Sequence, residues 1–163
     1  MIIAALDVGS HLALAVSGHE PIHFHCPGER PERLAAGMAW LDDQFKGFVD
    51  RDEGVDLIIY ERPFARGQHA TRSLWGIAGI IDAMAHKHGF PVIDIDPSSI
   101  KLWAAGKGNA DKDDMIAAAF LLGYHTDNEH KADAHCLLKF AEAHVQNDLF
   151  TPPEKPKRSK KNG

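Results

Sequence analysis

The chain has 163 residues, of which 44% are hydrophobic and 25% are charged. This length supports one domain with a sizeable core, and the composition is that of a globular protein rather than a disordered or fibrous one. No apolar run reaches the roughly 20 residues of a membrane helix, and no signal peptide opens the chain. With only two, widely spaced cysteines as well, we expect a cytoplasmic protein without a disulfide framework.

The charge is unevenly distributed along the chain. The formal net charge of −5 argues at first sight against a nucleic-acid partner. Residues 152–163, however, carry five of the 18 basic residues and one glutamate, so the remainder holds 13 basic and 22 acidic residues, a net charge of −9. We expect residues 1–148 to form the folded domain. Residues 149–163 are predicted to be a basic, disordered tail that attracts DNA without sequence preference or only aids solubility.

The predicted elements begin with strands. Residues 1–8 and 11–18 are short apolar runs joined by a Gly-Ser pair, which is typical of a β-hairpin. Residues 21–25 alternate weakly and predict a half-exposed third strand. Residues 31–49 then predict a helix with Pro31 at its first position. Its core-facing residues recur at spacings of three and four: Leu34, Met38, Leu41, Phe45 and Phe48.

Strands alternate with helices in the second half of the chain. Residues 55–60 are continuously apolar and predict a strand buried on both faces. A strand at residues 91–95 is followed by a predicted turn at 96–99. Asp111 is suited to cap a helix. Helices are predicted at residues 70–88, 111–122 and 130–146. This order predicts an α/β fold with a mixed five-stranded sheet flanked by helices.

Four polar residues lie where a small apolar core should not place them. Asp7 ends the first apolar strand, and Glu61 ends the buried strand. His130 and Asp133 lie one turn apart on the apolar stripe of the last helix. A carboxylate on such a stripe costs several kcal/mol unless it is paired or coordinates a metal. For this last pair alone, an acid placed at a helix start by the helix dipole is an equally good explanation.

The positions of the two strand-terminal acids favour one shared site. Each acid alone is more simply a loop residue, but both lie at the carboxyl end of a core strand, where open mixed sheets carry their sites. Together with His130 and Asp133 they form a mainly oxygen ligand set, which suits Mg²⁺ or Mn²⁺. Two such ions about 4 Å apart serve phosphodiester hydrolysis by in-line displacement.

Four motifs carry a resemblance to a known family: LDVGSHLALAVSG, YERPF, PSSIKLWAAGKGNADK and HKADAH. In order and spacing they are similar to the RuvC family of Holliday-junction resolvases, within the ribonuclease H-like superfamily, over residues 1–144. The resemblance implies a ribonuclease H-like fold. It also implies that Asp7, Glu61 and Asp133 are catalytic carboxylates, with His130 as fourth ligand and two Mg²⁺ ions that Mn²⁺ can replace. Asp127 lies close enough in sequence to be an alternative fourth ligand.

The resemblance gives roles to several further residues. Lys101 and Lys112 match two lysines near the scissile strand, and Lys112 also opens a helix behind a Gly-rich segment, where a phosphate can bind. We expect Lys112 to offset charge as the bond breaks. Phe64 matches an aromatic residue at the DNA surface, although the sequence alone slightly favours a buried phenylalanine. Three arginines are expected to contact phosphate: Arg62, Arg66 and Arg72.

A second group of metal-ligating residue types lies near the third strand. His19, His23, His25 and Cys26 have a spacing that suggests a zinc cluster. Alternation along an edge strand explains the same spacing without a metal, and we therefore predict no zinc site there.

The helix at residues 70–88 predicts an oligomeric state. Leu74, Ile77, Ile81 and Met84 form one apolar stripe, and Trp75, Gly76, Gly79 and Ile80 occupy another side. A helix that is apolar nearly all round is buried on more than one face, and one domain of this size cannot cover both. We expect a C2 homodimer, as the resemblance also implies, whose paired sites suit a four-way junction.

The predicted function is that of a crossover junction endodeoxyribonuclease, a metal-dependent enzyme that nicks branched DNA and resolves Holliday junctions by paired cleavage. One alternative is a nuclease of the same fold that acts on flaps, forks or RNA–DNA hybrids. The other is a catalytically silent branched-DNA-binding protein. A branch-migration helicase is left open as a partner, and so is the cleavage-site preference.

Overall fold

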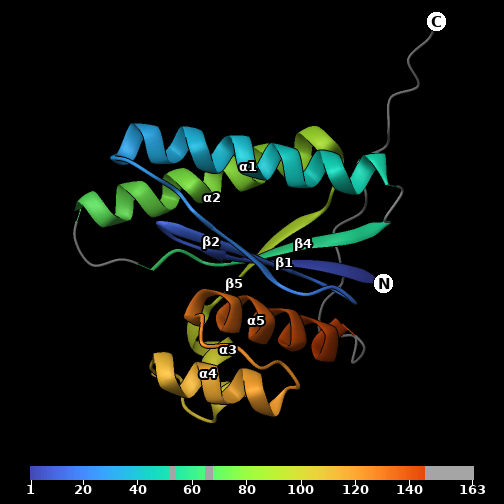
Figure 1. The fold of residues 1–163 in the computed structure, drawn as a ribbon, viewed down its shortest axis with the longest axis vertical. Coiled ribbons are helices and arrows are strands. Elements are labelled where there is room, and N and C mark those ends of the chain that lie inside the picture. Colours follow the sequence, from blue (N-terminus) through green and yellow to red (C-terminus); the bar gives the residue numbers. More distant parts are fainter. Residues whose placement is uncertain (52–53, 65–67, 146–163) are drawn as a thin grey trace, which may run out of the picture.

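The computed structural model describes residues 1–51, 54–64 and 68–145, and the predicted basic tail at 149–163 lies outside the described residues. One five-stranded sheet lies between two layers of helices (Figure 1). The strands are β1 (Ile2–Val8), β2 (His11–Val16), β3 (Ile22–His25), β4 (Val55–Glu61) and β5 (Val92–Ile95). The helices are α1 (Arg30–Asp50), α2 (Gln68–His88), α3 (Pro97–Ala105), α4 (Lys112–Leu121) and α5 (Glu129–Val145). None of these helices is long and apolar enough to span a bilayer.

The sheet is mixed, as predicted. Its strand order is β3-β2-β1-β4-β5, with antiparallel pairing among the first three strands and parallel pairing from β1 to β4 and from β4 to β5. The last parallel pair between the two central strands joins Leu6 to Tyr60. The next residue on each strand is therefore an acid, and the carboxyl ends of β1 and β4 present Asp7 and Glu61 side by side.

Helices α1 and α2 cover one face of the sheet (Figure 1). Leu41, Phe45 and Phe48 are buried there, but the prediction that Met38 faces the core is wrong, since its side chain is 45% exposed. The inward position belongs to Gly37, where an added Cβ would lie 3.0 Å from Ile77 Cδ1. The close approach of α1 to α2 at this glycine sets the rotation of α1, and that rotation turns Met38 outward.

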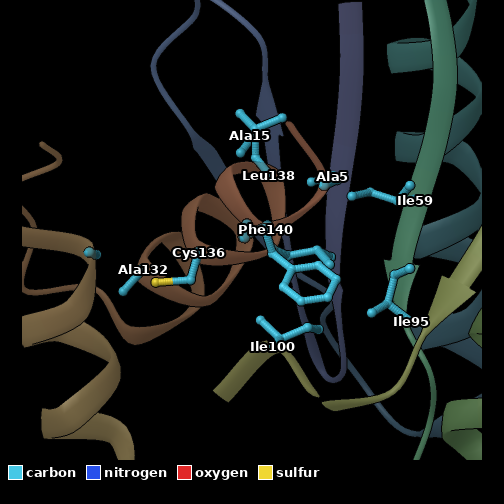
Figure 2. Packing of buried hydrophobic residues seen from close by; sticks show 14 of the residues in the cluster. Ala5, Ala15, Ile59, Ile95, Ile100, Ala132, Cys136, Leu138 and Phe140 are labelled. Carbon is cyan, nitrogen blue, oxygen red and sulfur yellow. The ribbon is translucent and has the colours of Figure 1, made fainter. Parts of the chain in front are cut away.

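Helix α5 covers the opposite face and is itself covered by α3 and α4 (Figure 1). Phe140 and Leu138 pack toward the sheet, whereas Ala132 and Cys136 point toward α4 (Figure 2). The Cys136 Sγ lies 3.8 Å from the carbonyl oxygen of Met115 on α4. Burial on two sides explains why α5 has apolar residues beyond a single stripe. Cys136 is a free thiol, and so is Cys26 in the other core.

The segment predicted as a turn at residues 96–99 is the start of a helix. The Asp96 side chain accepts a hydrogen bond from the backbone N–H of Ser99, and Pro97 occupies the first turn of α3. An Asp-Pro-Ser-Ser sequence suits a turn and a helix N-terminus equally well, and burial of Ile100 selects the helix. The predicted cap of α4 is confirmed, because Asp111 forms a reciprocal capping box with Asp114.

Candidate metal centre and its surroundings

The centre is built at the junction of β1, β4 and α5. Asp7 is the penultimate residue of β1 and Glu61 is the last residue of the neighbouring parallel strand β4, and α5 crosses the same sheet face above them. The first turns of α5 carry His130 and Asp133. The His130 Nδ1 lies 2.8 Å from the Asp7 Oδ2, so two of the four predicted ligands are in direct contact although 123 residues separate them.

Two of the carboxylates, Glu61 and Asp133, have a raised pKa. Burial raises the pKa of Glu61 to about 8, and the negative charges of Asp7 and Asp133 contribute to that rise. Burial and the Asp7 charge raise the pKa of Asp133 to about 7. The hydrogen bond to Asp7 raises the pKa of His130. Acids that resist ionisation beside one another are typical of a site that lacks its positive counter-charge.

The arrangement suits a divalent cation. The Oδ1 atom of Asp133 is buried and has no hydrogen-bond partner among the described residues. A buried polar atom without a partner costs free energy, and an ion bound to that oxygen would remove the cost. The donors that surround it are carboxylate oxygens and one imidazole nitrogen, a set that hard divalent ions accept.

The alternative fourth ligand is more exposed than His130. Asp127 is an exposed residue in the segment before α5. His130 is half-buried and directly bonded to Asp7. The geometry therefore favours His130 over Asp127 as the fourth member.

The two predicted lysines reach the centre in different ways. The Lys101 Nζ donates a 3.0 Å hydrogen bond to the carbonyl oxygen of Ala110, and its charge lowers the pKa of both Glu61 and Asp133. The Lys112 Nζ forms an ion pair with Glu129 at 2.5 Å and keeps a side chain that is 75% exposed. Lys101 is thus an inner cation of the site, and Lys112 is an outer cation at its rim.

The predicted DNA contacts are only partly brought together. Phe64 is 76% exposed, so the buried phenylalanine that the sequence favoured is wrong. The Arg62 Nε lies 2.6 Å from the Asp94 Oδ2, which engages this guanidinium within the protein. Arg72 is exposed on α2. Arg66 lies outside the described residues.

A row of histidines beside the centre was not predicted. His11 on β2 and His23 on β3 lie on the sheet face that α5 covers, and their rings approach the ring of His130 to centroid distances of 4.7 and 5.4 Å. His25 adds a fourth ring, 4.5 Å from that of His11. Burial first, and then the charge of His130, lowers the pKa of both His11 and His23.

The suggested grouping of His19, His23, His25 and Cys26 is not the one that forms. His19 is exposed and lies in the turn after β2, and Cys26 is buried in the core of the opposite face, 3.5 Å from the position of a Cβ on Gly37. The signal for the observed row was the alternation of His23 and His25, together with His11 just after the first hairpin turn. The pairing of β2 with β3 places these residues on one face.

Known proteins resemble this chain in sequence. No protein-family model matches the chain. A crossover junction endodeoxyribonuclease RuvC of Anaeromyxobacter sp. (strain K) is 38% identical over 131 residues, which cover 78% of this chain and 66% of the relative. The protein of the same description from Anaeromyxobacter dehalogenans (strain 2CP-1 / ATCC BAA-258) is 30% identical over 129 residues, with the same coverage. The chain thus spans 66% of the length of the curated relatives it matches.

The fold is similar to that of solved structures. The structure of Thermus thermophilus RuvC superimposes with a TM-score of 0.73 at 19% identity, covering 94% of this chain and 100% of that one. T. thermophilus RuvC in complex with a Holliday junction substrate gives the same TM-score at 17% identity and the same coverage. At these identities the likeness shows the ribonuclease H-like fold.

Proposed function

The chain belongs to the RuvC family, and we propose that it is a metal-dependent endonuclease that nicks branched DNA and resolves Holliday junctions by paired strand cleavage. The observation that carries this proposal is the contact of Asp7 with His130 beside the unpartnered oxygen of Asp133. A binding module has no use for a costly cluster of buried acids, whereas two-metal phosphodiester hydrolysis needs such a cluster to hold its ions.

We assign the ligand role to Asp7, Glu61, Asp133 and His130. These four residues would hold two divalent ions per site, with Mg²⁺ preferred and Mn²⁺ able to substitute, and the ions would supply activation of a water molecule and stabilisation of the departing oxygen. The protein supplies the geometry: β1 and β4 fix two carboxylates in register, and α5 sets the other two groups above them. Rigid elements on three sides hold the ligand oxygens in place, so little reorganisation is needed during the reaction.

The lysines and the aromatic residue position the DNA. Lys101 stands beside Glu61 and Asp133 and offsets negative charge as the phosphorus–oxygen bond breaks. Lys112, catalytic in this proposal, is exposed at the rim and exchanges its bond with Glu129 for a phosphate. Phe64 follows β4 and can stack on an unpaired base at the junction centre, which is worth roughly 1–3 kcal/mol. Arg62, Arg66 and Arg72 contact the backbone phosphates.

The partner in this proposal is a second copy of the chain. Trp75 on α2 is 50% exposed, and Gly79 on the same outer side is also exposed. Gly76 instead faces α1, because an added Cβ there would lie 3.1 Å from a methyl group of Leu34. Pairing through the outer side of α2 would give two centres related by a two-fold axis, which matches the two strands to be nicked. A branch-migration helicase is left open as a further partner.

Cleavage assays on defined substrates test the proposal. Labelled four-way junctions, Y-shaped forks, flaps and RNA–DNA hybrids are incubated with the protein in Mg²⁺, in Mn²⁺ and in chelator, and the products are separated on denaturing gels. We expect symmetric nicks in the four-way junction with either metal and none in chelator. Preferred cleavage of forks, flaps or hybrids would assign a different substrate. Junction binding without cleavage of any substrate would make the protein a binding module.

A further inference from the structure

We infer that His11, His23 and His130 form a nitrogen-donor site for a transition-metal ion, separate in its ligand chemistry from the carboxylate centre that it adjoins. One ligand nitrogen from each of these three residues lies within 4.8 Å of the other two. They come from β2, β3 and the first turn of α5. The site would exist even if the chain cleaved no DNA, because it depends only on the imidazoles.

The relative orientation of the rings supports a shared ion. The His11 Nδ1 and the His23 Nε2 lie 2.9 Å apart, while the ring planes differ by 7° and the centroids are 5.0 Å apart. A centroid distance so much longer than the nitrogen–nitrogen distance means that the rings meet edge to edge rather than face to face. These two nitrogens therefore face each other and form a hydrogen bond, in which one nitrogen donates and the other accepts.

An ion can take the place of that shared proton with small side-chain rotations. Zinc binds imidazole nitrogen at about 2.0–2.1 Å, so two nitrogens on a tetrahedral ion lie roughly 3.3 Å apart. The 2.9 Å separation must widen slightly, and the longest separation in the group, up to 4.8 Å, must shorten. The proton of the donor ring moves to its other nitrogen, so no charge is gained or lost by the histidines.

The third ligand is already oriented for this role. Asp7 bonds the Nδ1 of His130, which leaves Nε2 as the nitrogen that can bind an ion. A carboxylate that holds the far nitrogen of a metal-binding histidine fixes its tautomer and its ring orientation. Three imidazole nitrogens favour Zn²⁺, Co²⁺ or Ni²⁺ over Mg²⁺, which prefers oxygen.

A metal-binding measurement tests the site directly. Isothermal titration calorimetry with Zn²⁺ alone, and visible absorption spectra with Co²⁺ alone, are recorded for the wild type and for the His11→Gln and His23→Gln variants. We expect the wild type to bind, and each variant to bind at least about 10–100-fold more weakly, since even the loss of an outer partner of a ligand has that effect. Glutamine keeps the side chains polar and similar in size, and circular dichroism verifies that the variants fold.

Two controls separate this site from its neighbours. His19→Gln removes an exposed histidine from the same sheet edge and should leave Zn²⁺ affinity unchanged. Glu61→Gln removes a member of the carboxylate centre and should also retain Zn²⁺ binding while abolishing any cleavage. A wild type that does not bind Zn²⁺ or Co²⁺, or variants at positions 11 and 23 that bind as tightly as the wild type, would overturn the inference.

One consequence rests on the proposed nuclease function. Because His130 belongs to both groups, Zn²⁺ at the histidine site should withdraw it from the carboxylate centre and inhibit Mg²⁺-dependent junction cleavage. His11→Gln should then make cleavage resistant to Zn²⁺. If the chain cleaves nothing, this consequence falls, but the binding measurements still decide the metal site.

Discussion

At the scale of single residues, Glu61 and Asp133 are carboxylates whose charged form is disfavoured by their surroundings. Both are acids whose pKa is raised, to about 8 and about 7, by burial and by neighbouring carboxylates. A bound cation would stabilise the ionised carboxylates, because its charge offsets their mutual repulsion. The free-energy cost of ionising these two acids therefore applies to the metal-free protein, and it should lower the free energy of unfolding of that form.

The Glu61→Gln variant should be more stable than the wild type at pH 8 without metal. The folded pKa of Glu61 is about 8 against an ordinary value of 4.5, so the folded state binds more protons between these values. The unfolding free energy of the wild type should fall as pH rises from about 4.5 to about 8, and glutamine should restore on the order of 1–3 kcal/mol at pH 8. Urea unfolding at pH 5 and pH 8 in chelator measures both values.

The Glu20→Gln variant is a matched control for this substitution, since it removes one charge from an exposed side chain between β2 and β3. It should change the unfolding free energy by less than about 0.5 kcal/mol at either pH. Equal stabilisation by both variants would show that net charge, rather than the buried cluster, governs the pH dependence.

The Asp7→Asn variant should separate binding from cleavage. Asparagine removes a charge that a bound ion needs but keeps the shape of the strand end and a partner for His130. We expect cleavage of a four-way junction to fall at least about 100-fold, as for loss of a key electrostatic group. Junction affinity in gel-shift assays should stay within about threefold of wild type. Full cleavage by this variant would refute the assignment of Asp7.

At the scale of elements, the rotation of α1 is the point at which packing overrides the sequence pattern. The helix buries Phe45 completely and leaves Met38 exposed on the other side. The Phe45→Ala variant should lose about 3–5 kcal/mol of unfolding free energy because a large core side chain is deleted. Met38→Ala on the same helix should cost less than about 1 kcal/mol. Chemical denaturation of both variants, with circular dichroism detection, measures the difference.

The opposite result would restore the predicted orientation of α1. If Met38→Ala cost as much as Phe45→Ala, the apolar stripe would face the core as its spacing suggests. This outcome would be inconsistent with the structure, in which α1 and α2 are in close contact at Gly37. A methyl group added there would lie against Ile77.

At the scale of the whole molecule, the exposed outer side of α2 is where a second copy is predicted to bind. The Trp75→Glu variant places a charge on that side and should convert a dimer into a monomer in sedimentation velocity runs at micromolar concentration. A large loss of dimer affinity is expected because aromatic residues buried in an interface contribute much of its binding free energy. Glu is tolerated at an exposed helical position, so the monomer should keep its circular dichroism spectrum. A wild type that sediments as a monomer with and without junction DNA would contradict the dimer.

The sequence by itself determined most of the local structure, including the positions of Asp7 and Glu61 at the carboxyl ends of their strands. Period-two and period-3.6 patterns depend on neighbouring residues, so the strands, α4 with its Asp111 cap, and the strand-terminal positions of Asp7 and Glu61 could be predicted. The helix at Pro97 could not be distinguished from a turn, because one capping sequence serves both structures.

Only the tertiary structure decided how distant segments meet. It turned Met38 outward, exposed Phe64, paired Lys112 with Glu129, and placed His11 and His23 beside His130. The orientation of Met38 and the Lys112–Glu129 pair depend on the packing of one helix against another, and the histidine row depends on the register between β2 and β3. The residues involved are separated by up to about 120 positions, and periodicity along the chain records which face a residue occupies but not which residue it meets there.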